Sequence, residues 1–156
     1  MKKTLIYIRH SLISHTFLGP LKRTWQSALA VVASIGLKAK VYEAITDIGE
    51  GPYFDSWAAA GAKFGDGKTN FDAARETLPA DFFEHCCANA KKGVKTMFDM
   101  MADGDCGIAF GHSPVIEMAA HAPDFDMTGF QLKENQYIIF EQYEDGLISA
   151  VMPMQQ

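Results

Sequence analysis

The chain has 156 residues, a formal net charge of −5 and a hydrophobic fraction of 48%. These values are typical of a globular domain with a sizeable core, and they exclude a disordered tail, a collagen-like rod and a basic nucleic-acid-binding arm. No apolar run approaches the ~18 residues of a membrane span, and Arg9 and His10 interrupt the apolar stretch behind the N-terminal lysines. We therefore expect one domain over residues 1–156, in the cytoplasm, without nucleic-acid or membrane partners.

The first third of the chain alternates between strand and helix patterns. Residues 4–8 form an apolar run typical of a central parallel strand, and residues 16–18 give a weaker strand signal. Residues 20–35 predict a helix and residues 40–45 a strand. The predicted helix has one apolar stripe, which consists of Leu21, Trp25, Leu29 and Val32.

The middle of the chain contains a long connection and then a long helix. Residues 47–72 are rich in glycine and aromatic residues, so they predict a connection with one short helix around Trp57. Residues 79–101 predict a helix whose apolar stripe includes Cys86 and Cys87. These cysteines and Cys106 are too few for a disulfide framework and lack metal-ligand spacing, so we expect packing thiols.

The last third begins with a buried strand at 106–110 and a short helix opened by Pro114. Strand patterns follow at 130–132, 136–143 and 147–151, and they are joined by turns. The whole pattern predicts an α/β fold with a mostly parallel sheet and an antiparallel edge from the C-terminal strands.

Four cationic or titratable side chains follow predicted strands. Arg9 and His10 follow the strand at 4–8, His112 follows the strand at 106–110, and Arg23 lies at the start of the helix after the second strand. Each residue alone has an ordinary explanation, as a capping, packing or solvated side chain. Because ligands of open α/β sheets bind at the carboxyl ends of the strands, the four together predict an anion pocket, most simply for phosphate.

Three segments resemble the histidine phosphatase superfamily, which includes the phosphoglycerate mutases. Residues 5–11, LIYIRHS, are similar to its Arg-His-Gly signature. Residues 19–28, GPLKRTWQSA, resemble its motif Ser-Pro-Leu-x-Arg-Thr-x-Gln-Thr-Ala, and residues 109–116, AFGHSPVI, resemble its later strand that ends in Gly-His. Residues 131–151 are similar to its final strands. The resemblance implies a three-layer sandwich with helices on both faces of the central sheet.

The resemblance also implies a mechanism. His10 would attack phosphorus and form a phosphohistidine, which water then hydrolyses. Arg9, Arg23 and His112 would bind the phosphate oxygens together with His10, so neither a metal nor another cofactor is implied. The nearby arginines would keep His10 neutral, because positive charge disfavours the imidazolium.

The proton donor to the leaving oxygen is left open by the sequence. The family often has a carboxylate soon after its third strand, in a stretch similar to residues 42–51. Asp47 is the first choice, Glu50 and Glu43 are alternatives, and all three have an ordinary reading as solvated acids. The chain also departs from the family pattern, since Ser11 replaces a glycine and Gly19 replaces a serine.

Three functions agree with these residues. The first is a phosphomonoester hydrolase that acts on a small phosphorylated substrate or a phosphoprotein and releases phosphate. The alternatives are a catalytically silent phosphate-binding or interaction domain and, less favoured, a phosphoglycerate mutase. The aromatic residues of 49–78 either line the rim of the pocket or form a small satellite core.

The link between the first two predicted strands is too short. If the strands at 4–8 and 16–18 are parallel, a crossover of a dozen or more residues must join them. Residues 11–15 span at most ~18 Å when fully extended. We therefore predict that a helix-sized segment is missing near Ser11. The alternative is a true deletion that exposes one face of the sheet.

Overall fold

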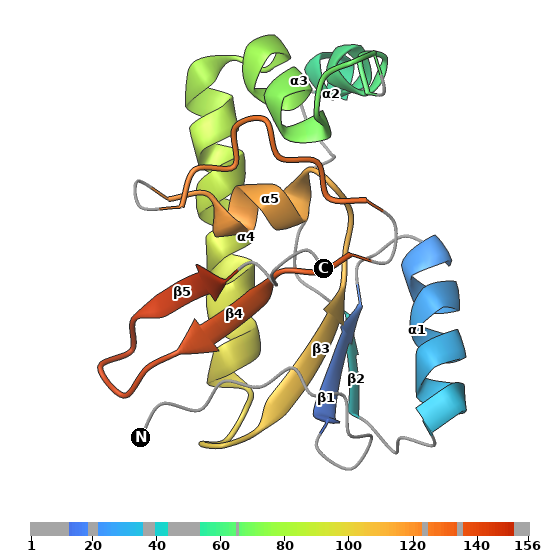
Figure 1. The fold of residues 1–156 in the computed structure, drawn as a ribbon, viewed down its shortest axis with the longest axis vertical. Helices are drawn as coiled ribbons and strands as arrows, with labels where there is room; N and C mark the ends of the chain where they lie inside the picture. Colours follow the sequence, from blue (N-terminus) through green and yellow to red (C-terminus); the bar gives the residue numbers. More distant parts are fainter. Residues whose placement is uncertain are drawn as a thin grey trace.

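A parallel sheet lies at the centre of the fold (Figure 1). The computed structural model describes residues 13–18, 22–35, 40–43, 54–64, 66–122, 125–133 and 136–151. Three strands, β1 (Ile13–Leu18), β2 (Lys40–Glu43) and β3 (Cys106–Phe110), form the sheet in the order β2–β1–β3. The mixed α/β class and the strands expected near 16–18, 40–45 and 106–110 are thus confirmed.

β1 is the middle strand, and both of its neighbours run parallel to it. Its last residue, Leu18, lies opposite Glu43 of β2 and Phe110 of β3. The carboxyl ends of the three strands therefore meet at one edge of the sheet. Phe17 and Leu18 are almost completely buried, which fits a central strand with both edges paired. β3 is less buried than the sequence predicts, because its residues alternate between half-buried and exposed.

α1 (Lys22–Ile35) follows β1 and packs on the sheet. The predicted helix is confirmed, but its predicted apolar stripe is wrong at one position. Leu29 is 62% exposed, and the neighbouring Ala28 is buried. At this turn of the helix, Ala28 takes the buried position in place of Leu29, whereas Trp25 is half-buried as predicted.

Four further helices build the other part of the molecule. They are α2 (Phe54–Gly61), α3 (Asn70–Thr77), α4 (Ala80–Asp99) and α5 (Val115–Ala120). α2, α4 and α5 confirm the predicted helices. α3 is not predicted: it begins inside the connection expected at 47–72 and continues through residues 73–77, for which the sequence gives no prediction. The missed signal is the cap of α3, where the Thr69 hydroxyl accepts a hydrogen bond from the Asp72 backbone N–H at 3.0 Å.

These helices enclose the main hydrophobic core. α4 packs along α5, and α2 and α3 lie at the amino end of α4 (Figure 1). Phe71 is completely buried, and its ring meets that of Phe83 edge to face at a centroid distance of 5.4 Å. Trp57 and Phe64 pack against the same cluster. The described aromatic residues of this region therefore form core, as one of the two sequence-based readings expects.

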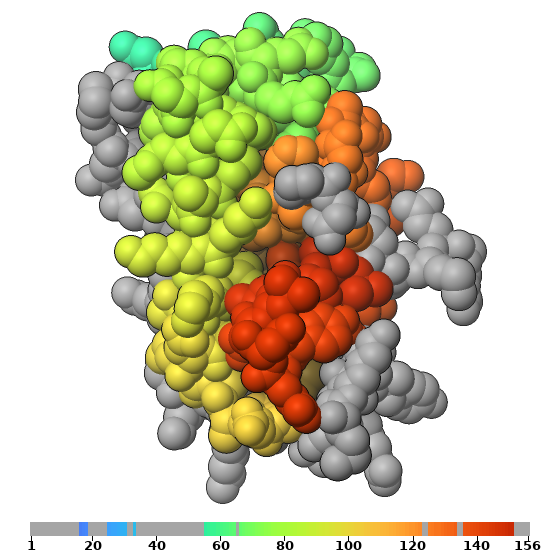
Figure 2. Space-filling model, turned by 90° about the vertical axis from the view of Figure 1, so that its left-hand side faces the viewer, coloured from blue at the N-terminus to red at the C-terminus, as the bar shows by residue number. Residues whose placement is uncertain are grey.

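The C-terminal strands form a sheet of their own. β4 (Ile139–Gln142) and β5 (Ile148–Val151) pair in antiparallel fashion, and the described residues show no pairing between them and the parallel sheet. The predicted antiparallel edge on the central sheet is therefore wrong for the described strands. Phe140 and Ala150 pack against the helical core instead, and Figure 2 shows the hairpin beside α4. Burial against helices replaces pairing at a sheet edge.

Residues 130–132 do not form the predicted strand. The Gln131 side chain bonds to the backbone of α3 and to the carbonyl of Leu132, while Leu132 itself is buried. Side-chain hydrogen bonds thus hold this segment in an irregular conformation, although its alternating apolar pattern predicts a β-strand.

Two further expectations concern the beginning of the chain and membranes. The strand at 4–8 and the segment expected to be missing near Ser11 lie outside the described residues. Among the residues that the structure describes, no helix has the length and apolar character needed to cross a membrane.

Phe71 provides a direct test of the core. We expect Phe71→Ala to lower the free energy of unfolding by about 3–5 kcal/mol, because it removes a completely buried ring and leaves a cavity. The matched control, Leu29→Ala, removes a largely exposed side chain and should change stability by at most about 0.5 kcal/mol. Urea unfolding measures both values, and equal losses in the two variants would contradict the assigned core.

Candidate functional site

The loop between β3 and α5 occupies the carboxyl edge of the parallel sheet. Gly111 and His112 follow β3 directly, and the His112 carbonyl accepts a hydrogen bond from the Ile116 N–H at 3.1 Å as the chain enters α5. A Cβ on Gly111 would lie 3.2 Å from Cγ1 of Ile116, so glycine permits this close turn. His112 is half-buried. Because it follows the carboxyl end of β3, it lies where ligands of open α/β sheets bind.

A cavity of about 510 Å³ adjoins this loop. Its volume falls in the range of small-molecule sites, about 300–1,000 Å³. One part of its wall comes from α3 and from the loop and start of α5: Asn70, Gly111, His112, Ser113 and Ile116. The other part comes from the segment before β4: Gln131, Leu132, Lys133 and Gln136. Most of these side chains are polar, so the cavity suits a ligand that forms hydrogen bonds.

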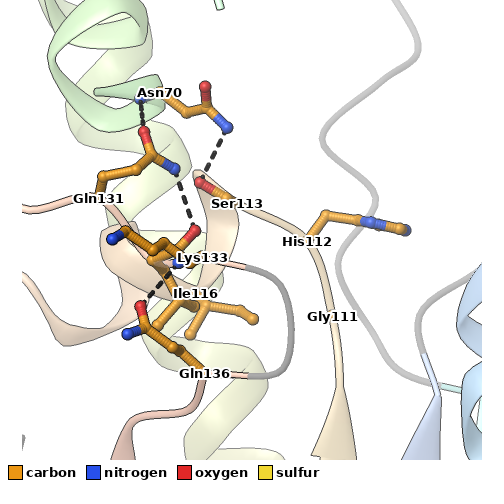
Figure 3. Close-up of a pocket in the computed structure, with 9 residues that line it drawn as sticks. Asn70, Gly111, His112, Ser113, Ile116, Gln131, Lys133 and Gln136 are labelled. Atoms are coloured by element: carbon orange, nitrogen blue, oxygen red, sulfur yellow. Dashed lines mark hydrogen bonds between the residues drawn. The ribbon is translucent and has the colours of Figure 1, made fainter. Parts of the chain in front are cut away.

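A chain of hydrogen bonds fixes the wall beside His112. Asn70 Nδ2 donates to Ser113 Oγ at 3.1 Å (Figure 3). Ser113 Oγ in turn donates to Glu117 Oε1 at 2.5 Å. These contacts join α3 to α5 across 43 residues of sequence. They also set the orientation of the Asn70 amide, because its nitrogen is directed toward Ser113.

Glu117 anchors this chain from the interior. Its side chain is completely buried. Burial raises the pKa of the Glu117 carboxyl above its ordinary value, while hydrogen bonds from Ser113 and from the backbone of Glu117 and Leu132 act in the opposite direction. A raised pKa favours the neutral carboxylic acid, which is less costly to bury than a carboxylate. The Glu117 carboxyl therefore fixes the position of the Ser113 hydroxyl from the interior.

The second part of the wall is also held by hydrogen bonds. Gln131 Oε1 accepts from the Asn70 backbone N–H at 2.9 Å, and Gln131 Nε2 donates to the Leu132 carbonyl at 3.0 Å. Gln136 Oε1 accepts from the Lys133 N–H at 2.8 Å. Because both ends of Gln131 are engaged, this residue acts as a fixed part of the wall.

α3 holds the start of the same segment. Asp72 Oδ2 accepts from the Gly129 N–H at 2.9 Å, and Arg75 donates to the Thr128 hydroxyl at 2.8 Å. The segment from 126 to 133 is thus tied to one helix at several points. A site that is held by such contacts is largely preformed.

The residues predicted to bind phosphate are only partly covered by the structure. His112 lies at the expected sheet edge and lines the cavity. Arg23 is in the first turn of α1, just after the carboxyl end of β1, but its side chain lies outside what the structure describes. Arg9 and His10 lie outside the described residues, so their convergence with His112 stays a prediction.

The predicted proton donors have a similar status. Glu43 is the last residue of β2 and so lies at the same edge of the sheet, although nothing is described of its side chain. Asp47 and Glu50 lie outside the described residues. The choice among the three stays open.

The three cysteines are poor candidates for a nucleophile. Burial raises the pKa of the Cys86 thiol to about 11 and that of Cys87 to about 12, and it also raises the pKa of Cys106. These thiols stay protonated near pH 7, as expected for packing residues. The described residues contain no group of three or more His, Cys, Asp or Glu side chains that could hold a metal ion.

Comparisons with known proteins do not distinguish between the functions that the sequence suggests. No protein-family model, curated protein or solved structure matches the chain. The resemblance to histidine phosphatases therefore rests on the motifs in the sequence. The structure adds the geometry around one of these motifs, the Gly-His turn after β3.

Sequence reasoning missed most of the cavity wall. Ser113 and Glu117 are four residues apart, a spacing at which side chains meet across one helical turn, so the sequence could have predicted their hydrogen bond. Asn70 and Gln131 are 61 residues apart, and no sequence pattern predicts their contact.

Glu117 gives the site a testable pH dependence. A carboxyl group with a raised pKa in the folded state stabilises the fold at low pH, and this contribution is lost as the pH rises through the folded-state pKa. Gln stays neutral at every pH. We therefore expect the stability of Glu117→Gln, measured relative to the parent by urea unfolding, to improve between about pH 5 and about pH 8.

The control for this experiment is Glu84→Gln, which removes a negative charge from an exposed position on α4. The stability difference between Glu117→Gln and the parent should change across this pH range. A constant difference would refute the raised pKa of the buried Glu117 carboxyl.

Proposed function

We propose that the chain is a histidine-phosphatase-like domain that hydrolyses phosphomonoesters through a phosphohistidine on His10. The three motifs, which occur in the family order, support this proposal. The observation that carries it is the position of His112, which lines a polar cavity at the carboxyl edge of a parallel sheet. Arg23 follows the neighbouring strand at the same edge.

The proposed chemistry uses side chains of the protein alone. His10 attacks the phosphorus atom, and the bond from phosphorus to the ester oxygen breaks. The leaving oxygen takes up a proton from Asp47, or from Glu50 or Glu43. Water then attacks the phosphohistidine and releases inorganic phosphate. Arg9, Arg23 and His112 neutralise the charge on the phosphate oxygens, which is the main requirement of phosphoryl transfer.

The proposal includes a three-layer sandwich and a cytoplasmic location. β1 is already paired on both sides, so a strand at 4–8 can join the sheet only outside β2 or β3. The proposal requires His10 to reach the phosphate bound beside His112.

The short link before β1 bears on this requirement. Ile13 opens β1 at the edge opposite His112, and His10 precedes it by three peptide steps, or ~11 Å at most. β1 itself is about 17 Å long. The proposal therefore includes the helix-sized segment near Ser11 that the sequence predicts to be missing.

The same observation favours a second candidate when the chain is continuous. Without a missing segment, the link of ~11 Å between His10 and Ile13 disfavours attack on a phosphate at the opposite edge. The chain would then be a silent phosphate-binding or interaction domain that keeps Arg23 and His112.

His10→Ala separates these two functions. We expect this variant to lower the turnover of an aryl phosphate by about 10³-fold or more, because it lacks the nucleophile. We also expect a rapidly formed, acid-labile and base-stable phosphoenzyme in the parent and none in the variant. The control, His85→Ala, removes an exposed imidazole of α4 and should keep both properties. A parent protein that binds phosphate but forms no phosphoenzyme would identify the silent domain.

A further inference from the structure

The segment before β4 contributes one exposed lysine to the residues that line the cavity. Lys133 is the only lysine or arginine among the described lining residues. The described residues also provide no ion-pair partner for its ammonium group. A cation in this position is notable in a chain whose formal net charge is −5.

No carboxylate in the described wall offsets this charge. The wall contains no Asp or Glu among the described residues, and the Glu117 carboxyl lies behind Ser113, completely buried. The two neighbouring amides add hydrogen-bonding groups, because Gln136 uses its Oε1 and Asn70 its Nδ2 within the wall. This leaves Gln136 Nε2 as a donor and Asn70 Oδ1 as an acceptor for a ligand.

The polar wall and His112 lie on different sides of Ser113. Figure 3 shows Gln131, Lys133 and Gln136 on one side, and the His112 ring extending away from them on the other. A ligand that touches both must therefore have two ends. The end at His112 is the phosphate of the proposed reaction, and the end at Lys133 is the rest of the molecule.

We propose that the Lys133 side of the cavity binds a second negatively charged group, which is carried by the alcohol part of a small phosphomonoester. This inference rests on the proposed function for the phosphate end and adds the substrate class. The cavity volume of about 510 Å³ suits a small molecule. Lys133 is thus a specificity-determining residue.

Non-hydrolysable ligands test this inference through binding, without any turnover. The probes are 3-phosphonopropanoate, which carries a carboxylate, and propylphosphonate, which has a similar length and lacks it. We expect the parent to bind the carboxylated probe about fivefold more tightly in isothermal titration calorimetry, as one solvent-accessible charged contact provides. This preference should decrease when the ionic strength is raised about tenfold.

Two lysine variants identify the contact. Lys133→Gln should bind both probes with equal affinity, whereas Lys92→Gln, which removes the same charge from an exposed position on α4, should keep the preference. Equal binding of the probes by the parent, binding of neither probe, or an unchanged preference in Lys133→Gln would each overturn the inference.

Turnover of an aryl phosphate distinguishes failure of this inference from failure of the proposed function. Turnover without a preference for the carboxylated probe leaves the phosphatase in place and removes the second anion site. A preference that depends on Lys133, in a protein without turnover, retains the anion site and removes the hydrolase.

Discussion

β1 is hydrogen-bonded in parallel to β2 on one side and to β3 on the other, although β3 follows it by almost 90 residues in sequence. Because all three strands point the same way, the residues that follow them gather at one edge of the sheet. α1 starts just beyond this edge after β1, and the Gly111–His112 turn leads from β3 into α5 there. The position of every candidate site residue in the described structure depends on this pairing.

The cavity wall depends on a second set of contacts, between α3, α5 and the segment before β4. Asn70, Ser113 and Glu117 form one continuous hydrogen-bonded chain, and the Asn70 backbone also binds Gln131. The buried carboxyl of Glu117 can take part because burial raises its pKa and favours its neutral form. These contacts give the protein a polar wall beside His112 that is held by side-chain hydrogen bonds.

The sequence predicts those features that have local causes. α4 and β3 are marked by long apolar patterns, and His112 is found because it directly follows β3. The antiparallel pairing of the C-terminal strands is confirmed, but among the described strands this pair does not join the parallel sheet. Its packing against the helical core is a tertiary contact that no local pattern shows. α3 and the path of residues 130–132 are missed because capping and side-chain bonds override simple periodicity there. The contacts of Asn70 join residues 43 and 61 positions apart, so no local pattern reveals them.

The central claim is that His10 and His112 act on the same phosphate at the carboxyl edge of the sheet. The most direct measurement is a titration of the protein, labelled in its histidine rings, with inorganic phosphate, followed by NMR. Our account predicts that the imidazole resonances of His10 and His112 shift together with one dissociation constant, while that of the exposed His85 does not move. A shift of His112 with an unmoved His10 would contradict it.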